Sequence, residues 1–278
     1  MAPLAQTLAL LAMAVATAAV DVVTLDMAQN SFDDQYQGCG PAMTAALPAL
    51  NRSEFQQNKK FAEVWLKAAA EWQSRGSPVS PLSSPSQAIA LMAYTMDDLY
   101  EEFNKAVRTA GSSSQEYRNN FHFKTLHFLL TDALETLRDT QGPGCHSLYR
   151  GVRGVRFEAE HGDIVRFGQF TSASQSKKTA QAFGIHTVFH VQTCHGVEIQ
   201  EFSKYPGEKE VLIPPFETFE VISVSQEEDR AWTQLRSSGT YSKYNCQWLR
   251  AGSVHLAPFL LGGLLLATTA LAVATGTL

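Results

Sequence analysis

Two glutamates lie two residues apart in the segment 207–214, which reads Gly-Glu-Lys-Glu-Val-Leu-Ile-Pro and contains Glu208 and Glu210. In an extended segment, alternate side chains point to the same face, which would place the two carboxylates about 6.6 Å apart. This distance is at the low end of the geometry of an inverting glycosidase, in which one carboxyl group donates a proton and the other activates a water. A Glu-x-Glu pair taken alone is more often a pair of solvated carboxylates.

Two further segments place polar residues beside apolar runs. Leu-Tyr-Arg-Gly at 148–151 contains Arg150, and Gly-Gln-Phe-Thr-Ser-Ala-Ser at 168–174 contains Ser172. A planar guanidinium suits a phosphate oxygen, and a Thr-Ser-Ala-Ser run is typical of a turn or an N-cap before a helix, here expected over 175–183. Neither segment has a role in the glycosidase scheme, which therefore becomes the weakest interpretation.

Taken together and in this order, the three segments resemble the arginine-specific ecto-ADP-ribosyltransferases. That family carries an Arg on a first strand, F-x-S-x-S or F-T-S-x-S on a second, and Glu-x-Glu before a third. The runs Arg-Phe-Gly-Gln-Phe-Thr-Ser at 166–172 and Glu-Val-Leu-Ile-Pro at 210–214 are the most specific matches. The resemblance covers nearly the whole chain.

The resemblance implies transfer of ADP-ribose from NAD+ to arginine side chains of proteins, with release of nicotinamide. NAD+ is then a substrate, and no permanently bound cofactor is expected. Glu210 would stabilise the oxocarbenium-like ribose from which nicotinamide departs. Arg150 would contact a pyrophosphate oxygen or a ribose hydroxyl, and Ser172 would orient the ribose and support Glu210.

Further roles follow from the same resemblance. Gly151 and Phe183 are expected at the NAD+ site, where Phe183 would stack on nicotinamide. Glu208 is expected to hold the guanidinium of the acceptor and to assist its deprotonation. Some relatives carry an Arg before Pro206, where this chain has Lys204-Tyr205, so that one phosphate contact is in doubt.

Two alternatives stay open. In the family, Gln in place of the first glutamate goes with hydrolysis of NAD+, so an NAD+ glycohydrolase differs from a transferase only in the attacking group. A catalytically inert cell-surface binding protein is the other alternative, and it is disfavoured by the presence of Arg150, Ser172 and Glu210. Incubation with labelled NAD+ separates the three.

Other chemistries lack their motifs. The chain has no P-loop, no G-x-G-x-x-G after a strand, no H-E-x-x-H and no G-x-S-x-G. His186, His190, Cys194 and His195 cluster in sequence, but on a strand His186 and His190 would be roughly 13 Å apart. Zinc requires ligands within about 2.3 Å of one ion, so we expect no metal site there.

The ends of the chain predict export. An uncharged apolar stretch with Ala16-Thr17-Ala18 after it predicts a signal peptide over 1–20. Small residues 251–253 and the apolar run 256–278 predict a glycosylphosphatidylinositol signal over 252–278, with a retained membrane span as the alternative. The protein is then expected on the outer face of the plasma membrane or secreted.

Export bears on the remaining chemistry of the chain. The four cysteines favour two disulfides, with three pairings possible. The resemblance implies Cys39 with Cys246 and Cys145 with Cys194. Asn51 begins an N-glycosylation sequon. The formal net charge of −5 argues against nucleic acid as a partner.

Composition changes once along the single catalytic domain expected over 21–251. The part 40–142 predicts helices over 53–76, over 87–111 and up to Gly142, because apolar residues recur at helical spacing. The part 145–246 contains short β-like runs at 148–149, 164–167, 187–191, 197–199, 211–213 and 219–224. We therefore expect an α+β fold, with a helical N-terminal half packed on a mainly antiparallel sheet of the ADP-ribosyltransferase type.

Overall fold

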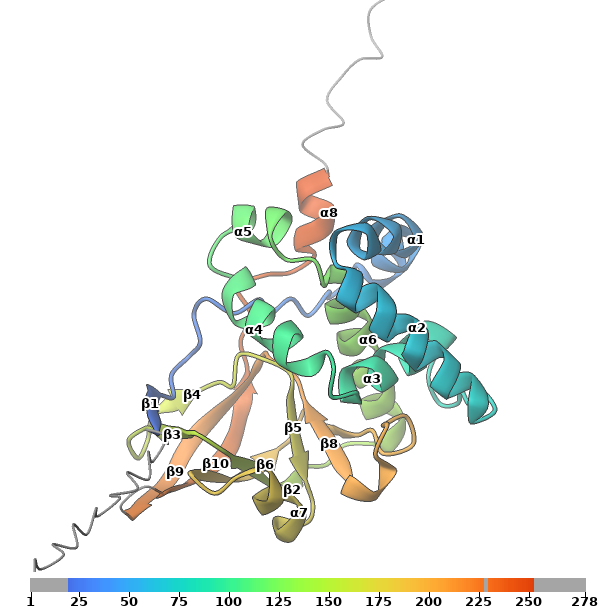
Figure 1. The fold of residues 1–278 in the computed structure, drawn as a ribbon. Coiled ribbons are helices and arrows are strands. Elements are labelled where there is room, and N and C mark those ends of the chain that lie inside the picture. Colours follow the sequence, from blue (N-terminus) through green and yellow to red (C-terminus); the bar gives the residue numbers. More distant parts are fainter. Residues whose placement is uncertain (1–19, 228–229, 253–278) are drawn as a thin grey trace, which may run out of the picture.

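The computed structural model describes residues 20–227 and 230–252, so most of the predicted signal peptide and of the predicted anchor signal lies outside the described residues. The helices are α1 (Gly40–Gln57), α2 (Lys59–Ser74), α3 (Pro85–Thr95), α4 (Tyr100–Ala110), α5 (Ser114–Asn119), α6 (Lys124–Gln141), α7 (Lys177–Phe183) and α8 (Gln247–Gly252). Figure 1 shows α1 to α6 gathered beyond one end of a twisted sheet. The expected α+β class is confirmed. Within the described ranges, no helix combines the length and the apolar character needed to cross a membrane.

The eight-stranded sheet has the order β4-β9-β10-β6-β2-β5-β8-β7. Its strands are β2 (His146–Val152), β4 (Ile164–Val165), β5 (Thr171–Ser174), β6 (Thr187–Thr193), β7 (Val197–Glu198), β8 (Glu210–Ile213), β9 (Glu217–Glu227) and β10 (Arg230–Thr240). Neighbouring strands are antiparallel except for β10 and β6. Strands β1 (Asp21–Thr24) and β3 (Val155–Glu158) form a separate parallel pair. The two halves of the large sheet meet at β2 and β5, which share one residue pair, Tyr149 with Ser174.

The helix boundaries correct two predictions. The helix predicted over 53–76 does not begin at Ser53, because residues 53–57 are the end of α1. The chain leaves helical geometry at Asn58 (φ −122°, ψ 92°), whose Oδ1 accepts a hydrogen bond from the Phe61 amide at 2.9 Å and so caps α2.

The helix predicted over 87–111 is in fact two helices, α3 and α4. Met96 adopts an extended conformation (φ −76°, ψ 136°), and helical geometry resumes only at Tyr100. The predicted apolar stripe is nevertheless buried through Leu99, Phe103 and Val107. The break leaves residues 96–99 as a connection that faces the site described below.

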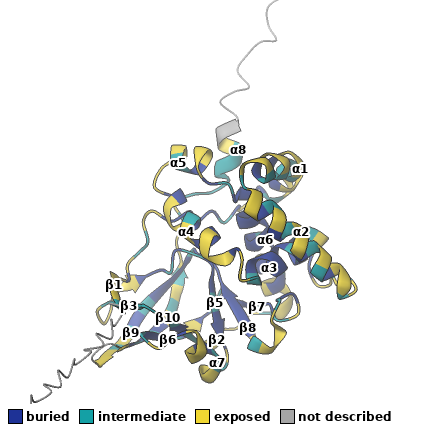
Figure 2. Cartoon of the chain, viewed as in Figure 1, coloured by how far each residue is buried: buried dark blue, intermediate teal, exposed yellow. Residues whose placement is uncertain are grey.

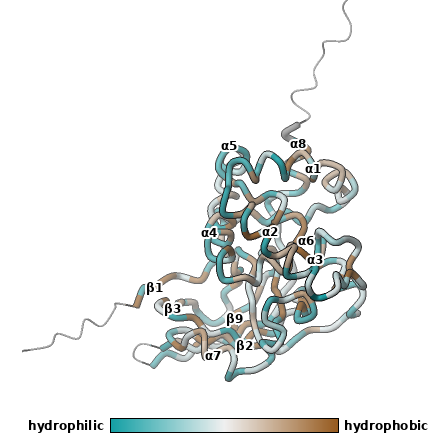
Figure 3. Tube along the Cα trace, turned by 45° about the vertical axis from the view of Figure 1, so that its right-hand side comes forward, coloured by the Kyte–Doolittle hydropathy of each residue, from teal (hydrophilic) through white to brown (hydrophobic). Residues whose placement is uncertain are grey.

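Phe170 fastens the sheet to the helices. It is fully buried in the helical core, and its ring stacks on Phe103 with a centroid distance of 5.6 Å. In Figure 2, α3 and α6 are largely dark blue, which marks buried residues. In Figure 3, the brown of hydrophobic residues lies near α6. Truncating a buried Phe costs about 3–5 kcal/mol, so Phe170 fixes the start of β5, and with it Ser172.

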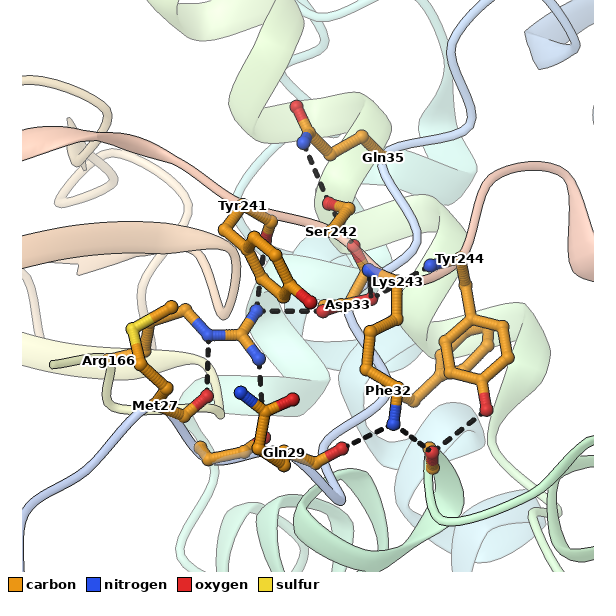
Figure 4. A network of polar contacts seen from close by, with 12 residues as sticks. Met27, Gln29, Phe32, Asp33, Gln35, Arg166, Tyr241, Ser242, Lys243 and Tyr244 are labelled. Atoms are coloured by element: carbon orange, nitrogen blue, oxygen red, sulfur yellow. Dashed lines mark hydrogen bonds and ion pairs between the residues drawn. The ribbon is translucent and has the colours of Figure 1, made fainter.

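A buried ion pair joins segments that are far apart in the sequence (Figure 4). Arg166 donates to Asp33 Oδ2 at 2.7 Å, and both side chains have no exposed surface. The guanidinium also donates to the carbonyl oxygens of Met27, Ala28 and Tyr241, so that four of its five N–H groups are hydrogen-bonded. The inward turn of Arg166 ends β4 at Val165, earlier than the run expected over 164–167.

Two disulfides are present, Cys39 with Cys246 and Cys145 with Cys194. These are the pairs that the family resemblance implies. The first closes a loop of 207 residues next to the Asp33 contacts, and the second joins the start of β2 to the end of β6. The second disulfide therefore braces β2, the strand that carries Arg150.

Candidate active site

A cavity of about 460 Å³ opens where β2 and β5 diverge. Helices α3 and α4, strands β2, β5 and β8, helix α7 and the 3-10 turn η1 (Pro206–Glu208) all contribute side chains. The cavity brings together every residue that the sequence predicts at the site: Arg150, Gly151, Ser172, Phe183, Glu208 and Glu210. These residues come from five separate elements, so the fold brings together residues that lie up to 60 positions apart in the sequence.

Glu210 is the first residue of β8, and its side chain is buried, with 7% of the residue exposed. The Ser172 hydroxyl donates to Oε1 at 2.5 Å, and the Ser203 hydroxyl donates to Oε2 at 3.1 Å. Burial raises the pKa of Glu210, while the two serine hydrogen bonds oppose that rise. The carboxylate is thus oriented through both oxygens.

Arg150 bridges the two halves of the sheet. Its Nη1 donates to the carbonyl oxygen of Ser172 at 2.7 Å, across the point where β2 and β5 share only one residue pair. Burial lowers the pKa of Arg150, and the nearby Glu210 carboxylate opposes this. A guanidinium remains charged in proteins, so the cavity holds a cation beside an acidic group.

Gly151 lets helix α7 approach the cavity wall. A Cβ at this position would lie 2.2 Å from the Ala180 carbonyl oxygen and 2.3 Å from that of Gly184. The close approach places Phe183, at the end of α7, on the cavity wall with 56% of its surface exposed. An exposed aromatic ring on a cavity wall is suited to stacking on a planar ligand.

Glu208 differs from the prediction in its backbone. The segment is not extended, because Glu208 ends the turn η1 and Lys209 adopts a left-handed conformation (φ 49°, ψ 51°) before β8 begins. The estimate of about 6.6 Å, which assumes an extended segment, therefore does not apply. Both carboxylates still line the cavity, and the Ser174 hydroxyl donates to the Glu208 carbonyl oxygen at 2.7 Å and holds the turn.

The site also contains residues that the sequence did not single out. Tyr94 donates its hydroxyl hydrogen to the Phe170 carbonyl oxygen at 2.9 Å, and Asn104 Nδ2 donates to the Tyr94 oxygen at 3.3 Å. Burial raises the pKa of Tyr94 to about 12, so the phenol stays protonated. Tyr94 lies on an apolar helix and Ser203 in a loop without a motif, so neither carries a sequence signal.

The segment at Lys204-Tyr205 is held by helices. Lys204 pairs with Glu71 at 3.0 Å, and Arg75 donates to the Ser203 carbonyl oxygen at 2.7 Å. The Tyr205 hydroxyl donates to Asp97 Oδ2 at 2.8 Å, in the connection between α3 and α4. Neither residue replaces the arginine of the relatives at the cavity, because the Lys204 ammonium pairs with Glu71 and the Tyr205 hydroxyl bonds Asp97.

The histidine cluster is dispersed. His186 Nδ1 accepts from the Gly154 amide, His190 stacks on Tyr149, and Cys194 is in its disulfide. Within residues 20–227 and 230–252, no group of three His, Cys, Asp or Glu side chains could hold a metal ion.

Comparisons with known proteins point in one direction. The model of the family described as NAD:arginine ADP-ribosyltransferase matches residues 25–243. The erythroblast NAD(P)(+)--arginine ADP-ribosyltransferase of Gallus gallus is 53% identical over 231 residues, which cover 82% of this chain and 77% of the relative. The GPI-linked NAD(P)(+)--arginine ADP-ribosyltransferase 1 of Homo sapiens is 47% identical and covers 84% of this chain and 78% of its own length.

Solved structures agree with these sequences. The crystal structure of the eukaryotic mono-ADP-ribosyltransferase ART2.2 superposes with a TM-score of 0.70 at 38% identity, covering 81% of this chain and 98% of that one. A mutant of the same enzyme in complex with NAD gives the same TM-score at 37% identity and the same coverage.

Proposed function

The chain belongs to the NAD:arginine ADP-ribosyltransferase family, and from this we propose that it cleaves NAD+ and transfers ADP-ribose to arginine side chains of proteins. NAD+ is consumed as a substrate, and the protein carries no resident cofactor in this reaction. The protein acts on the extracellular face of the cell membrane or as a secreted enzyme, in keeping with the GPI-linked relatives and with its two disulfides.

The observation that carries the proposal is the fixed carboxylate of Glu210. When the bond between nicotinamide and C1 of the ribose breaks, nicotinamide leaves with the electron pair, and positive charge develops on the sugar. A preoriented carboxylate stabilises that charge without reorganising, and Ser172 and Ser203 orient both oxygens of Glu210. Glu210 therefore acts on the donor.

Arg150 and Phe183 bind the rest of the donor. Arg150 supplies the cation for a pyrophosphate oxygen or a ribose hydroxyl, and its bond to the Ser172 carbonyl holds β5 at the donor. Gly151 admits α7 to the wall, and Phe183 stacks on the nicotinamide ring. The cavity volume of about 460 Å³ lies in the range of small-molecule sites.

Glu208 acts on the acceptor. It lines the cavity beside Glu210 and is only partly buried, so an arginine can reach it from solvent. A carboxylate binds a guanidinium through two parallel hydrogen bonds. The attacking guanidinium nitrogen bonds to the ribose C1 and loses one proton, which Glu208 accepts, so that nicotinamide, ADP-ribosyl-arginine and a proton are the products.

Incubation with labelled NAD+ and the arginine analogue agmatine tests this function. We expect label on agmatine together with free nicotinamide. Label found only as free ADP-ribose would identify a glycohydrolase. Intact NAD+ would identify an inert binding protein, and either result would overturn the transferase assignment.

The ends of the chain complete the proposal. Residues 1–20 act as a signal peptide, residues 21–251 form the catalytic domain, and residues 252–278 are exchanged for a glycolipid anchor. Asn51, in the fourth turn of α1, is the proposed glycosylation site. Its Oδ1 is buried without a partner, so a sugar on Nδ2 requires that the side chain turn outward.

A further inference from the structure

The two substrates of the proposed reaction make opposite electrostatic demands on one cavity. NAD+ carries two phosphates, whereas the acceptor brings a guanidinium. The cavity wall accordingly contains the cations Arg108, Arg150 and Arg153. It also contains three exposed or partly exposed carboxylates, Asp97, Glu101 and Glu208. Asp97 has no role in the binding of NAD+ described above, so its negative charge is available for the acceptor.

Asp97 is tied to Glu208 by a short chain of contacts. The Tyr205 hydroxyl donates to Asp97 Oδ2 at 2.8 Å, and the Glu208 amide donates to the Tyr205 carbonyl oxygen at 3.1 Å. The charge of Asp97 also acts on Glu208, because it adds to the effect of burial in raising the pKa of that carboxyl group. The two carboxylates thus lie on facing segments of one cavity mouth, and Tyr205 fixes their relative position.

Asp97 has a free oxygen for a ligand. Tyr205 bonds Oδ2, whereas Oδ1 has no hydrogen-bond partner within the residues that the structure describes. Asp98, the next residue, differs in this respect, because it forms an ion pair with Lys67 at 3.0 Å and does not line the cavity. Of these two adjacent carboxylates, only Asp97 is thus available to a substrate.

We propose that Asp97 is a second acceptor-specificity residue, which binds the arginine guanidinium together with Glu208. A guanidinium has five N–H donors in a fork, so it can bond one carboxylate through two of them and present others to a second carboxylate. Tyr205 positions Asp97 for this contact. The inference rests on the proposed transferase function, because it concerns the acceptor of that reaction.

The experiment compares wild type with Asp97→Asn, Asp97→Glu, Tyr205→Phe and the matched control Asp98→Asn. Initial rates are measured over a range of agmatine concentrations, and ADP-ribosyl-agmatine and free ADP-ribose are quantified in each reaction. Loss of one partly exposed charge pair corresponds to roughly a five-fold change in affinity. We expect Asp97→Asn to raise the KM for agmatine about five-fold, with kcat for transfer changed less than about twofold.

The other variants decide whether the carboxylate itself acts. Asp97→Glu should recover part of the lost affinity, and Asp98→Asn should leave the ratio of transfer to hydrolysis at the wild-type value. The inference is overturned if Asp98→Asn has the same effect as Asp97→Asn. The general negative charge of the segment, and not a contact of Asp97 with the guanidinium, would then account for the affinity for agmatine. It is also overturned if Tyr205→Phe raises the KM as much as Asp97→Asn does and Asp97→Glu recovers none of the lost affinity, because Asp97 then serves only to hold the tyrosine. A wild type that makes no ADP-ribosyl-agmatine contradicts the proposed function instead.

Discussion

The Ser172 hydroxyl donates a hydrogen bond of 2.5 Å to Oε1 of Glu210, across the pairing of β5 with β8. Ser172 and Glu210 are 38 residues apart in sequence and are not cross-strand partners, since Ser172 pairs with Leu212 and Ser174 with Glu210. The bond therefore runs diagonally over the sheet surface into the cavity. It fixes the carboxylate on which the proposed chemistry depends.

The first prediction concerns the charge of Glu210. Glu210→Gln keeps the shape of the side chain but removes the negative charge, so both transfer and hydrolysis should fall by roughly two to three orders of magnitude. The affinity for NAD+ should change little, because Arg150 and Phe183 remain. Product formation and equilibrium binding of NAD+ are measured on the same preparation. Near-normal turnover in this variant would contradict the role of Glu210 on the donor.

The second prediction concerns the pH dependence of the same group. The Ser203 hydroxyl stabilises the ionised form of Glu210, so Ser203→Ala should raise the pKa of Glu210 further. Since the ionised carboxylate is the active form, the acid limb of kcat/KM should move to higher pH, by up to about one pH unit for a hydrogen bond of about 1 kcal/mol. Ser223→Ala, on the exposed part of β9, is the control. An unchanged acid limb in Ser203→Ala would show that this serine does not act on the carboxylate.

Much of the site could be predicted from the sequence, because its residues lie in local patterns. Arg150, Ser172 and Glu210 each lie in a short motif, and the cavity contains all three. The bond between Tyr205 and Asp97 joins residues 108 apart, and no periodicity marks it. The break between α3 and α4 at 96–99 contains neither Gly nor Pro. The apolar residues keep their helical spacing across it, so nothing in the sequence indicates that the helix ends there.

The backbone of Glu208 escaped prediction for a different reason. The prediction from the sequence assumes that the segment before β8 is extended. Pro206 and Gly207 instead permit the turn η1, and the Ser174 hydroxyl donates to the carbonyl oxygen of Glu208. That bond depends on β5 lying beside β8, which is a tertiary contact. Residue identities were therefore predictable, whereas their backbone geometry required the fold.

The third prediction concerns His127, which is buried between two fixed partners. Its Nε2 lies 3.2 Å from the Phe32 carbonyl oxygen, which can only accept, so Nε2 carries the proton and Nδ1 accepts from the Tyr36 hydroxyl at 2.9 Å. Burial lowers the pKa of His127 to about 3. The unfolded state binds the proton more readily, so stability is fully present above about pH 6.5 and is lost as pH falls from there towards pH 3.

Replacement of His127 by Gln isolates this effect. The amide can make both hydrogen bonds but does not titrate, so the variant should lack the contribution of His127 to acid destabilisation. Relative to the variant, the wild type should lose about 2 kcal/mol of unfolding free energy between pH 7 and pH 5. Denaturant titrations at the two pH values measure it. Equal losses in the two proteins would show that His127 titrates normally in the folded state.

The fourth prediction concerns the membrane anchor. Phosphatidylinositol-specific phospholipase C should release the protein from cells that express the full chain, because only a lipid would hold it. A variant that ends at residue 250 should be found in the medium without treatment. Retention after phospholipase treatment, with peptides from 253–278 detected on the retained protein, would favour a membrane span.

The last prediction concerns the division of labour between the two glutamates. Glu210 is proposed to act on the donor and Glu208 on the acceptor, so their variants should differ in products. Glu208→Gln leaves an amide that can hydrogen-bond but cannot pair with a guanidinium charge, and a charge-assisted bond is worth about 1.5–3 kcal/mol. Transfer to agmatine should therefore fall by roughly one to two orders of magnitude, while NAD+ is still cleaved and water becomes the main acceptor. The ratio of ADP-ribosyl-agmatine to free ADP-ribose measures this, with Glu201→Gln at a nearby exposed position as the control. A parallel loss of both products would place Glu208 in the cleavage step, and an unchanged ratio would leave arginine specificity to other residues of the cavity.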